Sequence, residues 1–297
     1  MTGAERGFLL LTSHLGNPDR QVLTTAQFRI LADRVSHGDC PKEDRDLTVS
    51  DLVALGYGRD MAGRILKLLA EEDLLDHYWN RGQRLQCVPI TRVSGNYPLL
   101  LRQRLGLDSP GTLWAKGDLS LLTMPKIALV GSRDLLPENR AFAEEVGRQA
   151  ALQGFTLVSG NARGADRTAQ NACLKAGGAV ISIVADSLAQ KTLHQRILYI
   201  SEDDFDEDFS AQRALSRNRL IHCLGEKTFV AQSAHQTGGT WDGTVKNLRF
   251  GWSPVFCFDD GSCAAQALCQ MGAEPVTGEA LADLSGLQEA ELHFFDR

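Results

Sequence analysis

The 297-residue sequence lacks any apolar run long enough to cross a membrane, which takes about 20 residues. Its first residues also lack the long apolar core and the cleavage site of a secretory signal, so we expect no such signal. It has no Walker lysine pattern, no GxSxG motif and no HExxH motif. The sequence therefore predicts neither a membrane protein nor an enzyme of these three classes, and we expect no catalytic residues.

Positive charge is scarce as well. Lys and Arg number 31 against 37 Asp and Glu, which gives a formal net charge of −6. Proteins that coat nucleic acid are usually basic, so a nucleic-acid role here requires a local cationic pocket. The seven cysteines include no CxxC pair. We therefore expect reduced thiols packed as small apolar residues, a cytoplasmic location, and neither a metal site nor a cofactor.

The chain divides into three segments of different pattern. Residues 1–85 show helical periodicity, as along 23–35 and 60–75, and predict a small helical domain of SAM-like or winged-helix-like type. Residues 86–125 contain Pro and Gly at turn positions and predict a connector with extended pieces. Residues 126–297 form a third segment, whose pattern of strands and helices is described next.

In this last segment, short apolar runs alternate with glycine turns and amphipathic stretches. The strands that we expect are 126–130, 155–158, 179–185, 228–232, 254–258 and a short one at 274–276. This alternation predicts the α/β class, with a parallel sheet covered by helices on both faces. Right-handed crossovers would bring the glycine turns together at the carboxyl edge of the sheet.

Two of these turns have the composition of a phosphate site. Residues 130–133 (VGSR) place a glycine directly after a strand, where the backbone can approach a ligand and helix-start amides favour an anion. Arg133 adds a bidentate phosphate donor. Residues 159–166 (SGNARGAD) combine two glycines, a hydroxyl and an arginine. Asp166 is interpreted either as a helix cap or as a group that binds a sugar or base.

Two further motifs complete the candidate site. Residues 217–219 (RNR) adjoin an apolar run, and their guanidiniums require partners, either a phosphate or the acidic run 202–208 just upstream. That acidic run is itself expected to be a solvated loop. Residues 237–240 (TGGT) form another turn after a strand. The predicted DNA- or phosphate-binding residues are Gly131, Ser132, Arg133, Ser159, Gly160, Arg163, Gly164, Arg217, Asn218, Arg219, Gly238, Gly239 and Lys246. The candidates for base stacking are Phe205, Phe209 and Trp241.

The order and spacing of VGSR, SGxAxGxD and RNR resemble the DNA-processing protein A family, also called Smf. The stretch with NYP at 96–98 and KGD at 116–118 is similar to the one that leads into the Rossmann-like domain of that family. The resemblance covers roughly residues 90–260. It implies that residues 126–297 form a Rossmann-like domain that binds DNA or a nucleotide. It also implies binding of single-stranded DNA in a basic pocket, a homodimer, loading of the recombinase RecA and a role in natural transformation. It implies no established enzymatic activity. Gln170 stands where the family usually has a histidine.

A second interpretation stays open. The chain would then be a nucleotide-binding sensor, or a nucleotide hydrolase of the related Rossmann-like superfamily. Gly238-Gly239-Thr240 resembles part of the PGGxGTxxE signature of cytokinin-activating phosphoribohydrolases, although no glutamate follows at the required place. Competition between a DNA strand and free nucleotides would separate the two interpretations.

Overall fold

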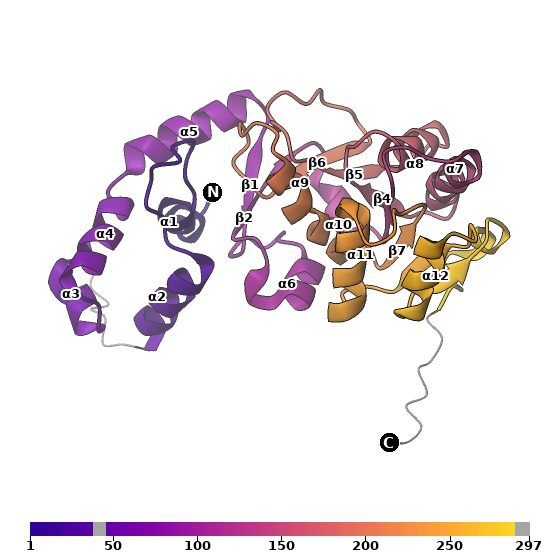
Figure 1. Ribbon diagram of the computed structural model, residues 1–297. Helices are drawn as coiled ribbons and strands as arrows, with labels where there is room; N and C mark the ends of the chain where they lie inside the picture. The colour runs from indigo at the N-terminus through magenta and orange to yellow at the C-terminus, as the bar shows by residue number, and fades with distance from the viewer. Residues whose placement is uncertain (38–45, 289–297) are drawn as a thin grey trace, which may run out of the picture.

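The computed structural model describes residues 1–37 and 46–288, and shows a lobe of helices beside an α/β lobe (Figure 1). The six cysteines within these residues are free thiols, whereas Cys40 lies outside them. Within the same residues, no helix combines the length and the apolar character needed to span a membrane. No group of three or more His, Cys, Asp or Glu in this described part could hold a metal ion.

The helices of the first lobe are α1 (Gly3–Thr12), α2 (Thr25–His37), α3 (Val49–Ala54), α4 (Arg59–Leu69) and α5 (Glu72–Arg84). The single helix expected over 60–75 is wrong, because α4 ends at Leu69 and α5 starts three residues later. Arg20 stabilises the break between α4 and α5. Its Nε forms an ion pair with Glu71 at 2.6 Å, and its Nη2 donates to the carbonyl of Leu68 at 3.4 Å. This buried guanidinium bonds to a backbone carbonyl that a continuous helix would pair with one of its own amides.

A nine-stranded sheet in the order β1-β2-β6-β5-β4-β3-β7-β8-β9 forms the second lobe. Its strands are β1 (Val88–Thr91), β2 (Thr112–Lys116), β3 (Lys126–Val130), β4 (Thr156–Ser159), β5 (Val180–Ile183), β6 (Ile197–Ser201), β7 (Lys227–Val230), β8 (Val255–Phe258) and β9 (Glu274–Val276). From β6 to β9 all neighbours are parallel, which confirms the α/β class and the Rossmann-like sheet. β1 and β2 add two antiparallel pairings.

Two features of the sheet differ from expectation. β6 was not among the expected strands, and β1 and β2 join the sheet from within the segment expected as a connector. The extended pieces in that segment therefore extend the sheet: β2 pairs with β6 and with β1, and β1 forms the edge. The division of the chain at residues 85 and 125 stays a prediction.

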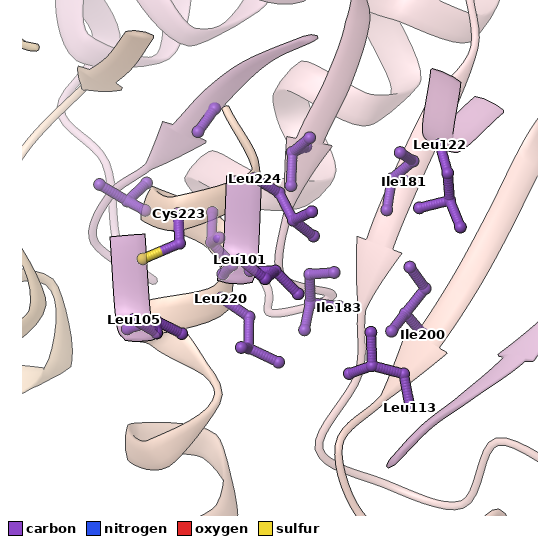
Figure 2. Packing of buried hydrophobic residues seen from close by; sticks show 14 of the residues in the cluster. Leu101, Leu105, Leu113, Leu122, Ile181, Ile183, Ile200, Leu220, Cys223 and Leu224 are labelled. Carbon is purple, nitrogen blue, oxygen red and sulfur yellow. The ribbon is translucent and has the colours of Figure 1, made fainter. Parts of the chain in front are cut away.

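Helices cover both faces of the sheet. The remaining helices are α6 (Leu99–Leu105), α7 (Pro137–Leu152), α8 (Ala165–Lys175), α9 (Ala211–Ser216), α10 (Asn218–Leu224), α11 (Gly238–Phe250) and α12 (Cys263–Gln270), with short 3-10 turns η1 (Gly106–Asp108), η2 (Leu119–Thr123) and η3 (Glu279–Asp283). α7 and α8 pack on one face, and α6, α10, α11 and α12 on the other. Figure 2 shows leucines of α6 and α10 against Ile181, Ile183 and Ile200 of the sheet. This core fixes α10, and with it the turn that precedes it.

The acidic run 202–208 is not the solvated loop that was expected. It ties the two lobes together, since Asp204 accepts a hydrogen bond from the Ser13 hydroxyl at 3.1 Å and Asp206 accepts one from the Tyr78 hydroxyl at 2.7 Å. Burial raises the pKa of Asp204, while its hydrogen bonds act in the opposite direction. The acidic run therefore forms part of the contact between the lobes, through partners more than 120 residues away in the chain.

Candidate phosphate-binding site

The largest convergence of predicted residues lies where β3, β4 and β7 end. β3 pairs with β4 on one side and with β7 on the other, so the direction of the strand order reverses there. Open α/β sheets bind ligands outside the carboxyl ends of strands at such a switch point. A cavity of about 410 Å³ occupies this place, and we call it the switch-point cavity. Predicted residues that line it are Gly131, Ser132, Arg133, Arg217, Asn218, Gly238 and Gly239.

Arg217 is the buried cation of the switch-point cavity. It lies between α9 and α10 and is only 7% exposed. Among the residues that the structure describes, none accepts a hydrogen bond from its Nε or Nη1. Burial lowers the pKa of this guanidinium, and the nearby carboxylate of Asp166 acts against that. A buried guanidinium with unpaired N–H donors is suited to bind an oxyanion, because donors without an acceptor in a protein interior are costly.

The start of α11 supplies a second source of positive potential. Gly238, Gly239 and Thr240 open this 13-residue helix and line the cavity, and the N-cap Thr237 makes no side-chain hydrogen bond to them. The first amides of a helix have no partner within the helix, and the helix dipole favours an anion there. Asn218 fixes the approach of this turn, since its Nδ2 donates to the Gly239 carbonyl at 3.2 Å. An anion in the cavity would thus meet Arg217 and helix-start amides together.

Asp166 stabilises the second glycine turn, residues 159–166, through a hydrogen bond to its backbone. It does not cap α8, whose N-cap is Gly164, but accepts a hydrogen bond from the Ala162 amide at 3.2 Å. Burial raises the pKa of this carboxyl, whereas Arg217 and the Ala162 amide lower it. The capping interpretation is therefore wrong in detail, and Asp166 instead faces Arg217 across the turn.

Two glycines of this turn are required by close contacts. A Cβ at Gly160 would collide with the Arg217 guanidinium and the Asp166 carboxylate. Gly164 has a φ of +86°, and a Cβ there would collide with the carbonyl oxygens of Ser132 and Arg133. These glycines do not cradle a ligand from the cavity wall. They allow β3, β4 and Arg217 to approach one another closely.

Ser132 differs from expectation in its backbone. Its amide donates to the Gln232 carbonyl at 2.9 Å, and its hydroxyl donates to the same oxygen at 3.2 Å. The Ser132 amide is therefore occupied by the fold. The turn at residues 130–133 was expected to offer backbone amides to an anion. In the structure, side-chain donors and the first amides of α11 are available instead.

Two predicted arginines surround the mouth of the site. Arg133 is exposed and lines both the switch-point cavity and an adjoining cavity of about 240 Å³. Arg163 lines the adjoining cavity, where its guanidinium pairs with Asp134 at 2.7 Å. Both partners are largely exposed, so this ion pair is weak and a phosphate could displace it at little cost.

Besides Gly160 and Gly164, three predicted residues line neither the switch-point cavity nor the adjoining cavity. Arg219 turns away and pairs with Glu202 at 2.5 Å, as the alternative of a partner in the acidic run anticipated. Lys246 pairs with Asp242 at 2.8 Å on the exposed side of α11. Ser159 is fully buried and accepts a hydrogen bond from Gln170 Nε2 at 2.7 Å.

The stacking candidates occupy three different environments. Phe205 is fully buried, with its ring stacked on Tyr78 at 4.5 Å between centroids. Trp241 packs partly against the core and contacts His235 edge-on at 5.2 Å. Phe209 is 58% exposed and lines the adjoining cavity, so it alone of the three offers a free aromatic face beside the arginines.

His222 is a cavity residue that sequence reasoning missed. It is buried on α10 and accepts a hydrogen bond at Nδ1 from Asn247 Nδ2, 3.1 Å away. The amide of Asn247 is oriented by Ser253, whose N–H donates to its Oδ1 at 2.9 Å. An accepting Nδ1 requires a neutral ring, and burial lowers the pKa of His222 to about 3. The only signal in the sequence is a histidine inside the apolar run 220–224.

This histidine predicts a loss of stability in acid. The unfolded chain binds a proton on His222 below pH about 6.5, whereas the folded chain resists protonation down to about 3. Stability from this group is complete above the unfolded pKa and is lost as the pH falls, by roughly 2–3 kcal/mol at pH about 4.5. Urea unfolding of the wild type and His222→Asn at several pH values measures it. The variant keeps an acceptor for Asn247 and should show a shallower decline, and equal declines would contradict the assignment.

Comparisons with known proteins agree with this architecture. The family model described as DNA recombination-mediator protein A matches residues 89–282. The chain is 32% identical over 183 residues to DNA processing protein DprA of Streptococcus pneumoniae (strain ATCC BAA-255 / R6), covering 57% of this chain and 64% of that protein. It is 29% identical over 170 residues to DNA processing protein DprA of Bacillus subtilis (strain 168), covering 53% and 56%. These alignments thus span less than two thirds of either relative.

Solved structures share the fold. The X-ray structure of DNA processing protein A from Streptococcus pneumoniae superposes with a TM-score of 0.68 at 24% identity, covering 94% of this chain and 96% of that chain. A structure of DNA processing protein A from Helicobacter pylori, described as giving insight into its single-stranded DNA binding mode, has a TM-score of 0.54 at 24% identity and covers 64% and 90%. At these identities the likeness concerns the fold.

Proposed function

This chain belongs to the DNA recombination-mediator protein A family, and from that premise we propose that it binds single-stranded DNA through the switch-point cavity. The observation that carries the proposal is Arg217, a guanidinium that is buried at the cavity with two N–H positions for which the described residues offer no acceptor. A backbone phosphate of the strand would accept from the Arg217 guanidinium and from the first amides of α11. Arg133 and Arg163 would contact neighbouring phosphates.

Such contacts position a strand without reading its sequence. Preference for a single strand over a duplex requires unstacked bases to meet an aromatic face. Phe209 is exposed beside Arg133 and Arg163 in the adjoining cavity, and it would supply that face. We propose that the chain acts by binding the strand rather than by chemistry on it.

Fluorescence anisotropy with a labelled poly-dT strand and its duplex tests the proposal. We expect tighter binding of the single strand, which weakens as salt rises because phosphate contacts release counterions. Free nucleotides at millimolar concentration should displace little of the strand. Binding of a mononucleotide without binding of a strand would contradict the proposal. It would favour the nucleotide-sensor interpretation, which the cavity volume of about 410 Å³ also allows.

We extend the proposal to partners and location on the family resemblance. The chain would act in the cytoplasm as a homodimer that loads a RecA-type recombinase onto the bound strand, in recombination of DNA taken up during natural transformation. Light scattering at high protein concentration tests the dimer. Strand-exchange assays with the recombinase, on a strand pre-coated with single-strand-binding protein, test the loading.

A further inference from the structure

His222 occupies a place on α10 where an apolar side chain would be buried at a lower cost in free energy. The other residues from 220 to 224 are buried and apolar, and His222 itself is only 1% exposed. Burying an imidazole is unfavourable unless its polar atoms are hydrogen-bonded. Asn247 bonds one of the two ring nitrogens, Nδ1. The other nitrogen, Nε2, decides what this side chain can do.

The hydrogen bonds behind the ring determine which nitrogen carries the proton. The backbone N–H of Ser253 can only donate, and it bonds Asn247 Oδ1 at 2.9 Å. The amide of Asn247 is thereby oriented, and its Nδ2 faces the Ser253 hydroxyl at 3.0 Å and His222 Nδ1 at 3.1 Å. An NH₂ group only donates, so Nδ1 must accept. Because burial lowers the pKa of the ring, its one proton lies on Nε2, which is therefore a donor without charge.

Nε2 is open to the switch-point cavity, which His222 lines. Within the described part of the chain, no hydrogen bond includes Nε2. It is nevertheless not among the nine buried N and O atoms there that lack a partner and are closed off from solvent. Gly243 of α11 keeps this nitrogen accessible, because a Cβ at position 243 would lie 3.1 Å from it. The donor therefore reaches the cavity without an acceptor from the protein.

The arrangement of α10 and α11, which lie side by side, brings this donor to the anion site (Figure 1). Asn218 and His222 are four residues apart and share one face of α10, and Gly239 and Gly243 oppose them on α11. The glycines allow His222 to approach the first turn of α11, whose amides favour an anion. Arg217 lies directly before α10. An oxyanion in the cavity would thus meet a cation, helix-start amides and a neutral imidazole.

We propose that His222 is a phosphate-binding residue of this chain, whose Nε2–H donates to a non-bridging phosphate oxygen held at Arg217 and the first turn of α11. The inference rests on the proposed function, since it requires a phosphate group in the cavity. Asn247 and Ser253 are positioning residues, because they orient the ring and do not themselves line the cavity. A neutral donor adds a hydrogen bond without releasing a counterion, which separates its effect from that of an arginine.

Two substitutions of His222 separate its donor from its acceptor. Asparagine offers an acceptor near the place of Nδ1 and nothing at Nε2, whereas glutamine offers an N–H near the place of Nε2 and no acceptor for Asn247. We expect His222→Asn to weaken binding of labelled poly-dT roughly three- to tenfold in anisotropy, as loss of one neutral hydrogen bond should. His222→Gln should retain more affinity. A solely structural role predicts the opposite order, since only glutamine disrupts the bond from Asn247.

The salt dependence of the same titrations identifies the kind of contact. In His222→Asn the slope of log K against log salt should equal that of the wild type, whereas Arg217→Met should reduce it by about 0.7, the value for one neutralised phosphate on a single strand. Gly243→Ala should also weaken binding, because its Cβ would cover Nε2 without removing the ring. Thr244→Val, a buried position of α11 that does not line the cavity, is the matched control and should bind as the wild type does.

The wild type alone offers a second readout that does not depend on how the variants fold. In long-range ¹H–¹⁵N NMR, one histidine ring should show a bare Nδ1 and a protonated Nε2 at pH about 7. The Nε2 resonance of this ring should shift when the strand is added, and its assignment to His222 is checked by its loss in His222→Asn. A charged ring, a proton on Nδ1 or an unshifted Nε2 would overturn the inference.

Failure of this inference and failure of the proposed function give different results. Full affinity in His222→Asn, with the strand lost in Arg217→Met, would overturn the role of His222 alone. If the wild type bound thymidine monophosphate but no strand, the proposed function would fail, and the same variants titrated with the mononucleotide would decide the role of His222. Absence of both ligands would overturn both. Urea unfolding of each variant verifies that it folds cooperatively.

Discussion

Replacing Arg217 with methionine is expected to weaken binding of single-stranded DNA roughly ten- to hundredfold, which corresponds to about 1.4–2.8 kcal/mol. The guanidinium of Arg217 is the one cation of the switch-point cavity that is buried, so its contact to a phosphate is poorly screened by salt. Exposed Arg133 lines the same cavity, and Arg133→Ala should lower the affinity less. Anisotropy with labelled poly-dT measures both variants.

The same substitution should leave the fold intact. Methionine has a similar length and no charge to bury. Asp166 is left buried without its cation and can take up a proton, which limits the loss of stability that an unpaired buried charge would cause. Asp166 then loses its neighbouring cation, and its pKa rises further. Lost binding in a variant that still unfolds cooperatively is characteristic of a binding residue. Arg148→Met removes an equal charge from the exposed side of α7 and should bind as wild type. If Arg217→Met also retained full affinity, Arg217 would not belong to the strand site.

Arg217 and Arg219 show how far a sequence motif can predict the position of its side chains. One residue separates the two arginines in the sequence, and the prediction placed both in the pocket. Successive residues of a helix are turned by about 100°, so side chains two positions apart point in nearly opposite directions. Arg217, directly before α10, lines the switch-point cavity, whereas Arg219 within α10 pairs with Glu202 of the acidic run. The motif identifies the element, but only the packing of that element decides which arginine meets a ligand.

The glycine turns were the most predictable part. Gly131, Gly160 and Gly164 follow or precede strands whose apolar runs are evident in the sequence, and the order of the sheet then brings them together. Their role was less predictable. They permit the backbone segments to approach, while the ligand-facing donors lie on Arg217 and on α11. Local sequence signals a tight turn, but it does not say which atom fills the space that the absent Cβ leaves.

The acidic run 202–208 marks the limit of local reasoning. Its composition is typical of a solvated loop, yet its partners Ser13 and Tyr78 lie in the helical lobe. Nothing within the run specifies these contacts. The strand β6 directly before it was missed for a related reason, since its short apolar run gains its identity from pairing with β5 and β2. Contacts between distant segments decide both features.

Gly164→Ala is expected to destabilise the protein by roughly 3–5 kcal/mol, from a disfavoured backbone conformation and from overpacking together. Gly164 has φ +86° and ψ −128°, a combination that side-chain-bearing residues avoid. A Cβ there would also collide with backbone carbonyls of Ser132 and Arg133, which cannot rotate away as a flexible side chain can. The Ala165 amide donates to the Ser132 carbonyl at 3.1 Å, so relief of the collision would break this bond between β3 and α8.

Gly154→Ala separates the two causes. Gly154 also has a positive φ, of +78°, but nothing lies within 4 Å of the position that its Cβ would take. Its substitution should cost only the backbone strain, about 1–2 kcal/mol. Urea unfolding of both variants gives the difference, which measures how tightly the first and second glycine turns pack. Equal losses in the two variants would mean that the turns can separate without penalty. The switch-point cavity would then be a deformable site that closes around its strand, rather than one already formed by the fold.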